Sequence, residues 1–159
     1  MQILVALATT RSSEEIGARA VEEARASGLG LTLLLVTERD ELSQVYQLRC
    51  HPAFQGTRTL EDVLREIELE HRRMLEGQAL AIEASARDLG VEVETRLAVG
   101  DYPTQMALET RRRSYAAVYW LRHNRGFIAR FFLGDDADEV VRTTPGPDGH
   151  YPPDAFQAG

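Results

Sequence analysis

Four cationic side chains lie close together in one stretch, residues 121 to 135, of a chain that is otherwise acidic. They are Arg122, His123, Arg125 and Arg130. Guanidinium groups can bind a phosphate through paired hydrogen bonds, so this cluster is one candidate anion site. The competing interpretation, which we favour, is that the four cations offset nearby surface carboxylates. Those carboxylates are Asp135, Asp136 and Asp138.

Two histidines elsewhere are weaker candidates for chemistry. Cys50 and His51 could act as nucleophile and base, but adjacent residues in a loop rarely point toward each other. His71 lies on the apolar side of a predicted helix, and no second histidine follows at helical spacing. This favours a histidine at the edge of the core over a metal ligand.

All 18 basic residues are arginine, which excludes a phosphate-loop lysine and a Schiff base. We therefore predict neither a catalytic residue nor a metal site.

The composition fits one domain with a buried core. The chain has 159 residues, 43% of them hydrophobic, and a formal net charge of −7 at pH 7. This acidic balance argues against nucleic-acid binding, since phosphates attract basic surfaces. No apolar run reaches membrane-spanning length, and the first residues lack the pattern of a signal peptide. We therefore expect a cytoplasmic protein without membrane contact. The single cysteine excludes an internal disulfide.

Four apolar segments are predicted strands. The runs Ile3 to Ala8, Leu31 to Val36 and Ala116 to Leu121 are continuously apolar, as expected for strands covered on both faces. The segment Val91 to Leu97 alternates apolar and polar residues, which indicates a strand at a sheet edge or half exposed. Residues 37 to 57 show no clear period and are predicted to be a long excursion.

Local signals predict where two helices begin. The sequence Ser12-Ser-Glu-Glu15 has the spacing of a capping box, which would open a helix after the first strand. The inward residues of that helix should be Ile16, Ala20 and Ala24. Gly100-Asp-Tyr-Pro103 should start another helix, because aspartate caps well and proline suits a first turn.

Two further helices are predicted from periodicity. A long one begins at Thr59 and ends at Gly90. Its expected apolar stripe consists of Leu60, Val63, Leu64, Ile67, Met74, Ile82 and Leu89. A last short helix should run from Asp135 to Arg142.

Strands that alternate with helices imply a parallel sheet with helices on both faces. We therefore predict a three-layer α/β/α domain, Rossmann-like, with a mainly parallel sheet of four or five strands. Such sheets bind ligands at the carboxyl ends of their strands, where the strand order reverses. The candidate corners are Ala8 to Thr10, Val36 to Thr37, Val99 to Gly100 and the loop after Leu121. The domain should span residues 1–145, followed by a tail, 146–159, rich in proline and glycine.

At these corners the chain resembles the universal stress protein family, over roughly residues 2 to 145. The local matches are Ile3-Leu-Val5, Val99-Gly-Asp-Tyr-Pro103, and Arg130-Phe-Phe-Leu-Gly134 followed by Val140-Val-Arg142. Nucleotide-binding members of that family carry Gly-x-x-Gly, nine further residues, then Gly-Ser or Gly-Thr. The resemblance places these four positions at Leu121, Asn124, Gly134 and Asp135. It also places the family's aspartate after the first strand at Ala8.

These departures imply a vestigial nucleotide site. A branched side chain at Leu121 would fill space that glycine leaves for a phosphate, whereas Asn124 tolerates a left-handed backbone. Asp135 would cap the helix itself and repel a phosphate by about 4 kcal/mol at about 4 Å, with an effective dielectric of roughly 20. The residues of this vestigial site are Ala8, Thr9, Val36, Gly100, Arg122, Asn124, Arg125, Gly134 and Asp135. We expect no cofactor; the alternative is ATP or AMP held by the arginine-rich loop.

The resemblance implies a stress-response or regulatory module that acts through protein contacts, with ATP binding weak or lost and no enzymatic activity. The alternative is an adenine-nucleotide-binding stress protein that uses the rewired loop and hydrolyses slowly. A third interpretation is an accessory subunit whose fold is retained for assembly. The partner protein is unknown, and we expect a homodimer.

Members of the family usually finish with a fifth apolar strand, which commonly forms the dimer contact. Here residues Thr144 to Pro153 carry prolines that cannot donate ladder hydrogen bonds, so we expect this strand to be missing. Ala116 to Leu121 would then be an exposed sheet edge. We expect another subunit to cover that edge, or the tail to fold back over it through Tyr151 and Phe156.

Overall fold

The computed structural model describes residues 1–9, 11, 13–38, 60–123 and 138–157. In chain order, the elements in these ranges are β1 (Gln2–Ala8), α1 (Glu15–Ser27), β2 (Gly30–Thr37), α3 (Leu60–Asp88), β3 (Val93–Val99), α4 (Tyr102–Arg112), β4 (Tyr115–Arg122) and β5 (Glu139–Thr143).

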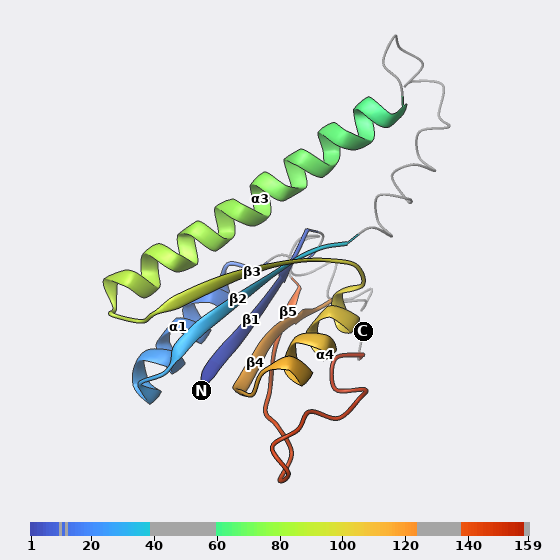
Figure 1. Ribbon diagram of the computed structural model, residues 1–159. Helices are drawn as coiled ribbons and strands as arrows, with labels where there is room; N and C mark the ends of the chain where they lie inside the picture. Colours follow the sequence, from blue (N-terminus) through green and yellow to red (C-terminus); the bar gives the residue numbers. More distant parts are fainter. Residues whose placement is uncertain (10, 12, 39–59, 124–137, 158–159) are drawn as a thin grey trace, which may run out of the picture.

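The five strands form one sheet in the order β3-β2-β1-β4-β5. β1 to β4 run parallel to one another, and β5 is antiparallel to β4. α1 and α3 cover one face of the sheet, and α4 covers the other (Figure 1). The predicted three-layer arrangement with a mainly parallel sheet is confirmed. The edge position predicted for Val91 to Leu97 is also correct, because β3 is an outer strand.

β1 is buried on both sides because the two helical layers pack against opposite faces of it. Ile3, Val5 and Leu7 belong to the core beneath α1 and α3, whereas Leu4 and Ala6 belong to the core beneath α4. A strand in this position has no solvent-facing side chains, which explains its continuously apolar sequence. On α1 the predicted inward residues, Ile16, Ala20 and Ala24, are all fully buried.

α1 and α3 approach each other closely at Gly17. A Cβ atom added to this glycine would lie 2.5 Å from Ile82 Cγ1, so no larger residue fits without a shift. Among the α3 side chains that the structure describes, the buried ones recur every three or four residues, and two of the four are alanines. They are Leu75, Ala79, Ile82 and Ala86.

Part of the predicted stripe on α3 is therefore wrong. Met74 and Leu89 were expected to face inward, but their side chains are 60% and 45% exposed. A stripe that follows the large apolar residues misses the alanines that a close helix contact requires. The side chains of Leu60, Val63, Leu64 and Ile67 lie outside the described part of the chain.

The two predicted helix starts have different outcomes. Asp101 caps α4 as expected, since its Oδ2 accepts a hydrogen bond from Thr104 N–H at 3.1 Å. The capping box at residues 12–15 is wrong, because α1 begins at Glu15 rather than two residues earlier. Glu14 occupies the cap position without a side-chain capping bond, and Ser13 Oγ accepts from Glu15 N–H at 3.2 Å.

The region predicted to be the last short helix is also different. Residues 139 to 143 form strand β5, which lies along β4 with Trp120 opposite Val141. Trp120 Nε1 donates to Thr143 Oγ1 at 2.9 Å, and Arg142 forms an ion pair with Glu23 of α1 at 2.7 Å. These contacts, together with two adjacent valines, favour an extended backbone over a helix. The expectation that a fifth strand is missing, and that β4 is an edge, is therefore wrong.

The tail folds back, but onto a face of the sheet rather than its edge. As predicted, the described residues from 144 to 153 contain no strand. Tyr151 OH donates to Tyr115 O at 3.0 Å, and Phe156 is 2% exposed with its ring edge-on to Trp120 at 6.0 Å. The tail thereby completes the core layer that α4 covers. The division of the chain at residue 145 stays a prediction. Within the ranges given above, no helix is long and apolar enough to cross a membrane.

Candidate functional site

The strand order reverses between β1 and β4. From β1 the chain adds β2 and β3 on one side and then places β4 on the other side. In parallel α/β sheets such a reversal leaves a crevice at the carboxyl ends of the two strands. Here the pairing of β1 with β4 ends at Val5 and Tyr119, although both strands continue. The crevice therefore opens beyond these two residues.

The hydroxyl group of Tyr102 fills the gap between the two strands. It donates to Ala6 O of β1 at 2.5 Å and accepts from Leu121 N–H of β4 at 3.0 Å. Tyr102 reaches this position because Asp101 caps α4 at the neighbouring end of β3. The side chain is 1% exposed, and burial raises the pKa of its hydroxyl far above the ordinary value. Tyr102 therefore bridges β1 and β4 as a neutral group.

Arg11 covers Tyr102 from the loop that follows β1. Its guanidinium lies 4.6 Å from the centre of the Tyr102 ring, and its Nη1 donates to Leu121 O at 2.9 Å. Its Nε lies 3.5 Å from Glu38 Oε1, just beyond β2. The side chains of Arg11 and Glu38 are only 12% and 10% exposed. We call Arg11, Tyr102 and Glu38 the crevice cluster.

The crevice cluster is suited to closing the site rather than to chemistry. The arginine is paired with a carboxylate, and the tyrosine is neutral and bonded to backbone on two sides. Nothing in it is an activated nucleophile or a poised base. Nor do the described residues hold a group of three or more histidine, cysteine, aspartate or glutamate side chains that could bind a metal ion.

The structure brings together four of the predicted site residues at the carboxyl edge. Ala8 and Val36 face each other in the β1–β2 ladder and are buried, so neither side chain offers a polar group. Thr9 N–H donates to Val36 O at 3.2 Å, and Thr9 Oγ1 accepts from the N–H of Glu38 at 3.3 Å. Gly100 N–H donates to the carbonyl oxygen at the end of β2, at 3.0 Å. These three polar groups, Thr9 N–H, Thr9 Oγ1 and Gly100 N–H, are thus bonded within the protein.

The two described cations of the predicted cluster are also paired. Arg122 Nε donates to Glu139 Oε2 at 3.0 Å, across the β4–β5 ladder. His123 Nδ1 lies 3.0 Å from Asp138 Oδ1, and both side chains are largely buried. Of the carboxylates predicted to offset the cations, Asp138 is the one described with such a contact, to His123, whereas Arg122 pairs with Glu139 instead. The other predicted positions, Asn124, Arg125, Gly134 and Asp135, lie outside the described residues, as do Arg130, Cys50 and His51.

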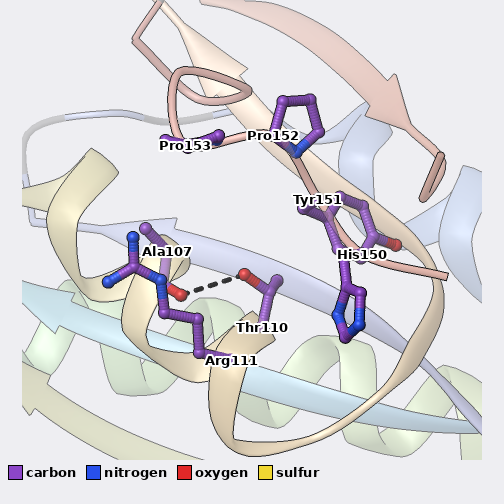
Figure 2. Close-up of a pocket in the computed structure, with 7 residues that line it drawn as sticks. All are labelled: Ala107, Thr110, Arg111, His150, Tyr151, Pro152 and Pro153. Atoms are coloured by element: carbon purple, nitrogen blue, oxygen red, sulfur yellow. Dashed lines mark hydrogen bonds between the residues drawn. The ribbon is translucent and has the colours of Figure 1, made fainter. Parts of the chain in front are cut away.

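Two secondary candidates have clear positions. His71 is partly buried, four residues before Leu75 on the buried side of α3, which agrees with a place at the edge of the core. A hollow of about 210 Å³ lies between α4 and the tail, away from the crevice cluster (Figure 2). Figure 2 shows Arg111 and His150 at its walls, with Thr110 Oγ1 donating to Ala107 O at 3.0 Å. It contains none of the predicted site residues.

Sequence reasoning missed the residues that matter most in the crevice. Arg11 stands one position beyond the corner Ala8 to Thr10. Tyr102 stands within a motif that predicts a helix start and matches the family, but that gives the tyrosine itself no role. An arginine next to a strand end and an aromatic residue at a helix start were the available signals. Neither indicates its partner, because the two are 91 residues apart, the difference between positions 102 and 11.

A sequence model of the universal stress protein family matches residues 1–148. The chain belongs to the universal stress protein family. A search of curated proteins gave no match. Among solved structures, a universal stress family protein from Burkholderia pseudomallei is similar, with 18% identity and a TM-score of 0.50; the match covers 82% of this chain and 86% of that one. The hypothetical protein MJ0577 matches with 13% identity and a TM-score of 0.50, over 71% of this chain and 69% of that one.

A universal stress protein from Archaeoglobus fulgidus, solved in complex with dAMP, is also similar. It has 19% identity and a TM-score of 0.49, and the match covers 89% of this chain and 98% of that one. At these identities the two structures with a TM-score of 0.50 support the fold of this universal stress protein alone, and its site has to be judged from its own residues.

Proposed function

We propose that this universal stress protein is a stress-response regulatory module that acts through protein contacts and binds adenine nucleotides weakly or not at all. A cytoplasmic location and a homodimeric state are parts of the same proposal. The observation that carries it is the crevice cluster, in which the protein's own side chains occupy the place where the fold would accept a ligand.

Two backbone donors beside the crevice, in the part of the chain that the structure describes, already have partners. Leu121 N–H donates to Tyr102 OH, and Thr9 N–H donates to Val36 O. Phosphate sites in α/β folds depend on backbone N–H groups that are free to point at the anion. A phosphate at this corner would have to displace existing hydrogen bonds before it gained any.

Displacement of Arg11 would be costly as well. Its guanidinium is paired with Glu38 in a largely buried position, and separating a buried ion pair costs several kcal/mol. Micromolar affinity requires a net gain of about 8 kcal/mol. The contacts of a bound nucleotide would have to offset the cost of separating Arg11 from Glu38 and still leave this net gain. This supports weak or absent binding.

The alternative, a nucleotide-binding stress protein with an arginine-based site, has one specific observation in its favour. Among the residues that the structure describes, Arg11 Nε makes no hydrogen bond although it is buried. This Nε faces Glu38 Oε1 at 3.5 Å, beyond hydrogen-bond geometry, and a guanidinium held in this way at a strand end could turn to meet a phosphate. Arg11 would then bind the ligand instead of occupying the ligand's place in the crevice.

Calorimetry with magnesium ATP and magnesium AMP separates these two functions. We expect no heat of binding from the purified protein, and no adenine nucleotide released when it is denatured and the supernatant is chromatographed. Micromolar affinity, or stoichiometric released nucleotide, would contradict the proposal.

The variant Arg11→Ala distinguishes the two roles of this residue. If Arg11 closes the crevice, Arg11→Ala binds nucleotide no more weakly than the original protein and can gain affinity. If Arg11 is a ligand, the variant loses whatever affinity the original protein has. Arg19→Ala is the matched control, because Arg19 lies over another tyrosine, Tyr119, at 5.7 Å and away from the crevice.

A further inference from the structure

The free edge of β3 offers a surface for another strand. β3 ends the sheet on the side opposite β5, and among the described elements it pairs with β2 only (Figure 1). Two of its apolar side chains are well exposed, Leu97 at 75% and Val99 at 46%. An uncovered strand edge of this kind can pair with another chain. The residues of β3 itself indicate which strand fits.

The odd-numbered residues of β3 direct their backbone groups away from β2. Leu31 N–H donates to Glu92 O at 2.8 Å, and Gly100 N–H donates to Thr37 O at 3.0 Å, so residues 92 and 100 face β2. Backbone hydrogen-bonding groups alternate between the two sides of a strand. The outward donors and acceptors therefore belong to Val93, Thr95, Leu97 and Val99.

We propose that β3 pairs antiparallel with β3 of a second copy of this chain, with Thr95 of one copy opposite Thr95 of the other. This extends the proposed function, a module that works through protein contacts, by naming the surface and the partner. The two sheets would then form one continuous sheet through their β3 edges. Outward backbone groups meet outward backbone groups in this register, as an antiparallel ladder requires.

The charges of β3 are complementary to themselves in this register. Glu94 of each copy lies directly opposite Arg96 of the other, so that two ion pairs form across the ladder. On the other side of the sheet Val93 lies opposite Leu97 of the second copy. Opposite charges and apolar pairs directly opposite each other stabilise strand pairing, whereas like charges destabilise it.

Neighbouring registers lack this match. In each alternative register a different residue lies opposite its own copy. If that residue is Glu94, two glutamates oppose each other, and if it is Arg96, two arginines do. Centring the pair on Val93 sets Glu92 against Glu94. Centring it on Leu97 leaves Arg96 opposite alanine. Only the register centred on Thr95 opposes unlike charges without opposing like ones.

The side chains are already placed for this exchange. Arg96 Nε donates to Glu94 Oε1 at 3.1 Å within the chain, and the two side chains are 27% and 40% exposed. Each side chain also has a second partner within the chain, Arg113 for Glu94 at 2.7 Å and Glu109 for Arg96 at 3.4 Å. Pairing between copies would share or exchange these contacts. Beside the edge, an open hollow of about 650 Å³ is lined by Glu83 of α3 together with Val93 and Thr95. Leu97 of the second copy, opposite Val93, would enter this hollow and lose its exposure to water.

The test is the mass of the full chain in solution, measured by light scattering over a range of concentrations. The original protein should be a dimer. Glu94→Arg and Arg96→Glu each oppose like charges and should each give a monomer, whereas the double variant Glu94→Arg/Arg96→Glu should restore the dimer. Arg25→Glu reverses one charge of an exposed pair on α1 and should leave the dimer intact. Circular dichroism checks that every variant is folded.

A cysteine tests the register. In a Cys50→Ser background, Thr95→Cys should form a disulfide between copies on mild oxidation. Residues opposite each other in a hydrogen-bonded antiparallel pair have Cα atoms about 5.5 Å apart, within disulfide range. Leu97→Cys should not cross-link, since its counterpart across the ladder is Val93.

Two results would overturn the inference. One is a monomer at all concentrations; the other is a dimer that Glu94→Arg leaves unchanged. Neither result bears on nucleotide affinity, which calorimetry measures separately, so this inference and the loss of nucleotide binding fail independently.

Discussion

The two ends of the sheet each combine a tyrosine with an arginine–glutamate ion pair, but in different surroundings. At the carboxyl end Arg11 and Glu38 are 12% and 10% exposed, and Arg11 bonds to the backbone of β4. Near the amino end Glu109 accepts a hydrogen bond from Tyr115 OH at 2.6 Å and forms an ion pair with Arg96 at 3.4 Å.

The amino-end group is the more exposed of the two. Glu109 is 5% exposed, but Arg96 is 27% exposed, and a second arginine beside it, Arg112, is 68% exposed. Its bonds join side chain to side chain, whereas the crevice cluster joins side chains to the backbone of two strands. The same residue types thus join two strands at one end and stabilise a surface at the other.

Loss of Arg11 should have the largest effect. Arg11→Met removes the guanidinium that bonds to Leu121 O, lies over Tyr102 and pairs with Glu38 in a largely buried position. We therefore expect the free energy of unfolding to fall by about 3 kcal/mol. Arg19→Met, which removes an arginine over Tyr119, should cost less than about 1 kcal/mol. Urea unfolding of both variants measures the difference. Equal losses would mean that burial does not distinguish the two arginines.

Tyr102→Phe should rank second. It removes two hydrogen bonds and leaves Ala6 O and Leu121 N–H buried without that partner, which should cost about 2 kcal/mol. Tyr115→Phe removes the hydrogen bond to Glu109, a carboxylate that keeps its arginine, and should cost about 1 kcal/mol. The comparison uses the same unfolding measurement. A larger loss for Tyr115→Phe would reverse our ranking of the two ends.

Glu109→Gln should have a smaller effect than either carboxyl-end change. The amide can still accept from Tyr115 OH, and Arg96 keeps its pair with Glu94, so we expect a loss of about 1 kcal/mol. Salt sharpens this test, because the arginines paired with Glu109 are 27% and 68% exposed. Screening should therefore shrink the loss for Glu109→Gln more than the loss for Arg11→Met. Identical salt dependence would contradict the assigned difference in exposure.

Alkaline pH should produce an effect that the Tyr115→Phe variant isolates. Burial, followed by the hydrogen bond to Glu109, raises the pKa of Tyr115 to about 12. Because the folded pKa lies above the ordinary value of about 10, the stabilisation is fully present below pH 10 and is lost as the pH rises through 12. Tyr115→Phe should therefore lose less stability than the original protein between these values. Parallel curves for the two proteins in pH-dependent unfolding would refute this.

Much of the fold was predictable because local patterns and packing agree. The continuous apolar runs of β1, β2 and β4 follow from burial on both faces. The Asp101 cap was predictable for the same reason, since its partner, Thr104, is three residues away. Features that depend on nearby residues can be read from one sequence.

Features that depend on distant residues could not be predicted in this way. β5 was taken for a helix because its extended form depends on Trp120 and on Glu23 of α1. The buried stripe of α3 depends on the contact of Gly17 with Ile82. In the site, the position of Gly100 and Ala8 at one edge followed from topology, but the pairing of Arg11 with Tyr102 did not.

The contact of the tail with the sheet has a practical consequence. The chain has one tryptophan, Trp120, which is 2% exposed and lies between Thr143 of β5 and Phe156 of the tail. Its fluorescence therefore reports on one place only, where β4, β5 and the tail meet. Any event that lifts the tail lets water reach the indole and moves its emission to longer wavelength, so docking of the tail can be followed in real time without an added label.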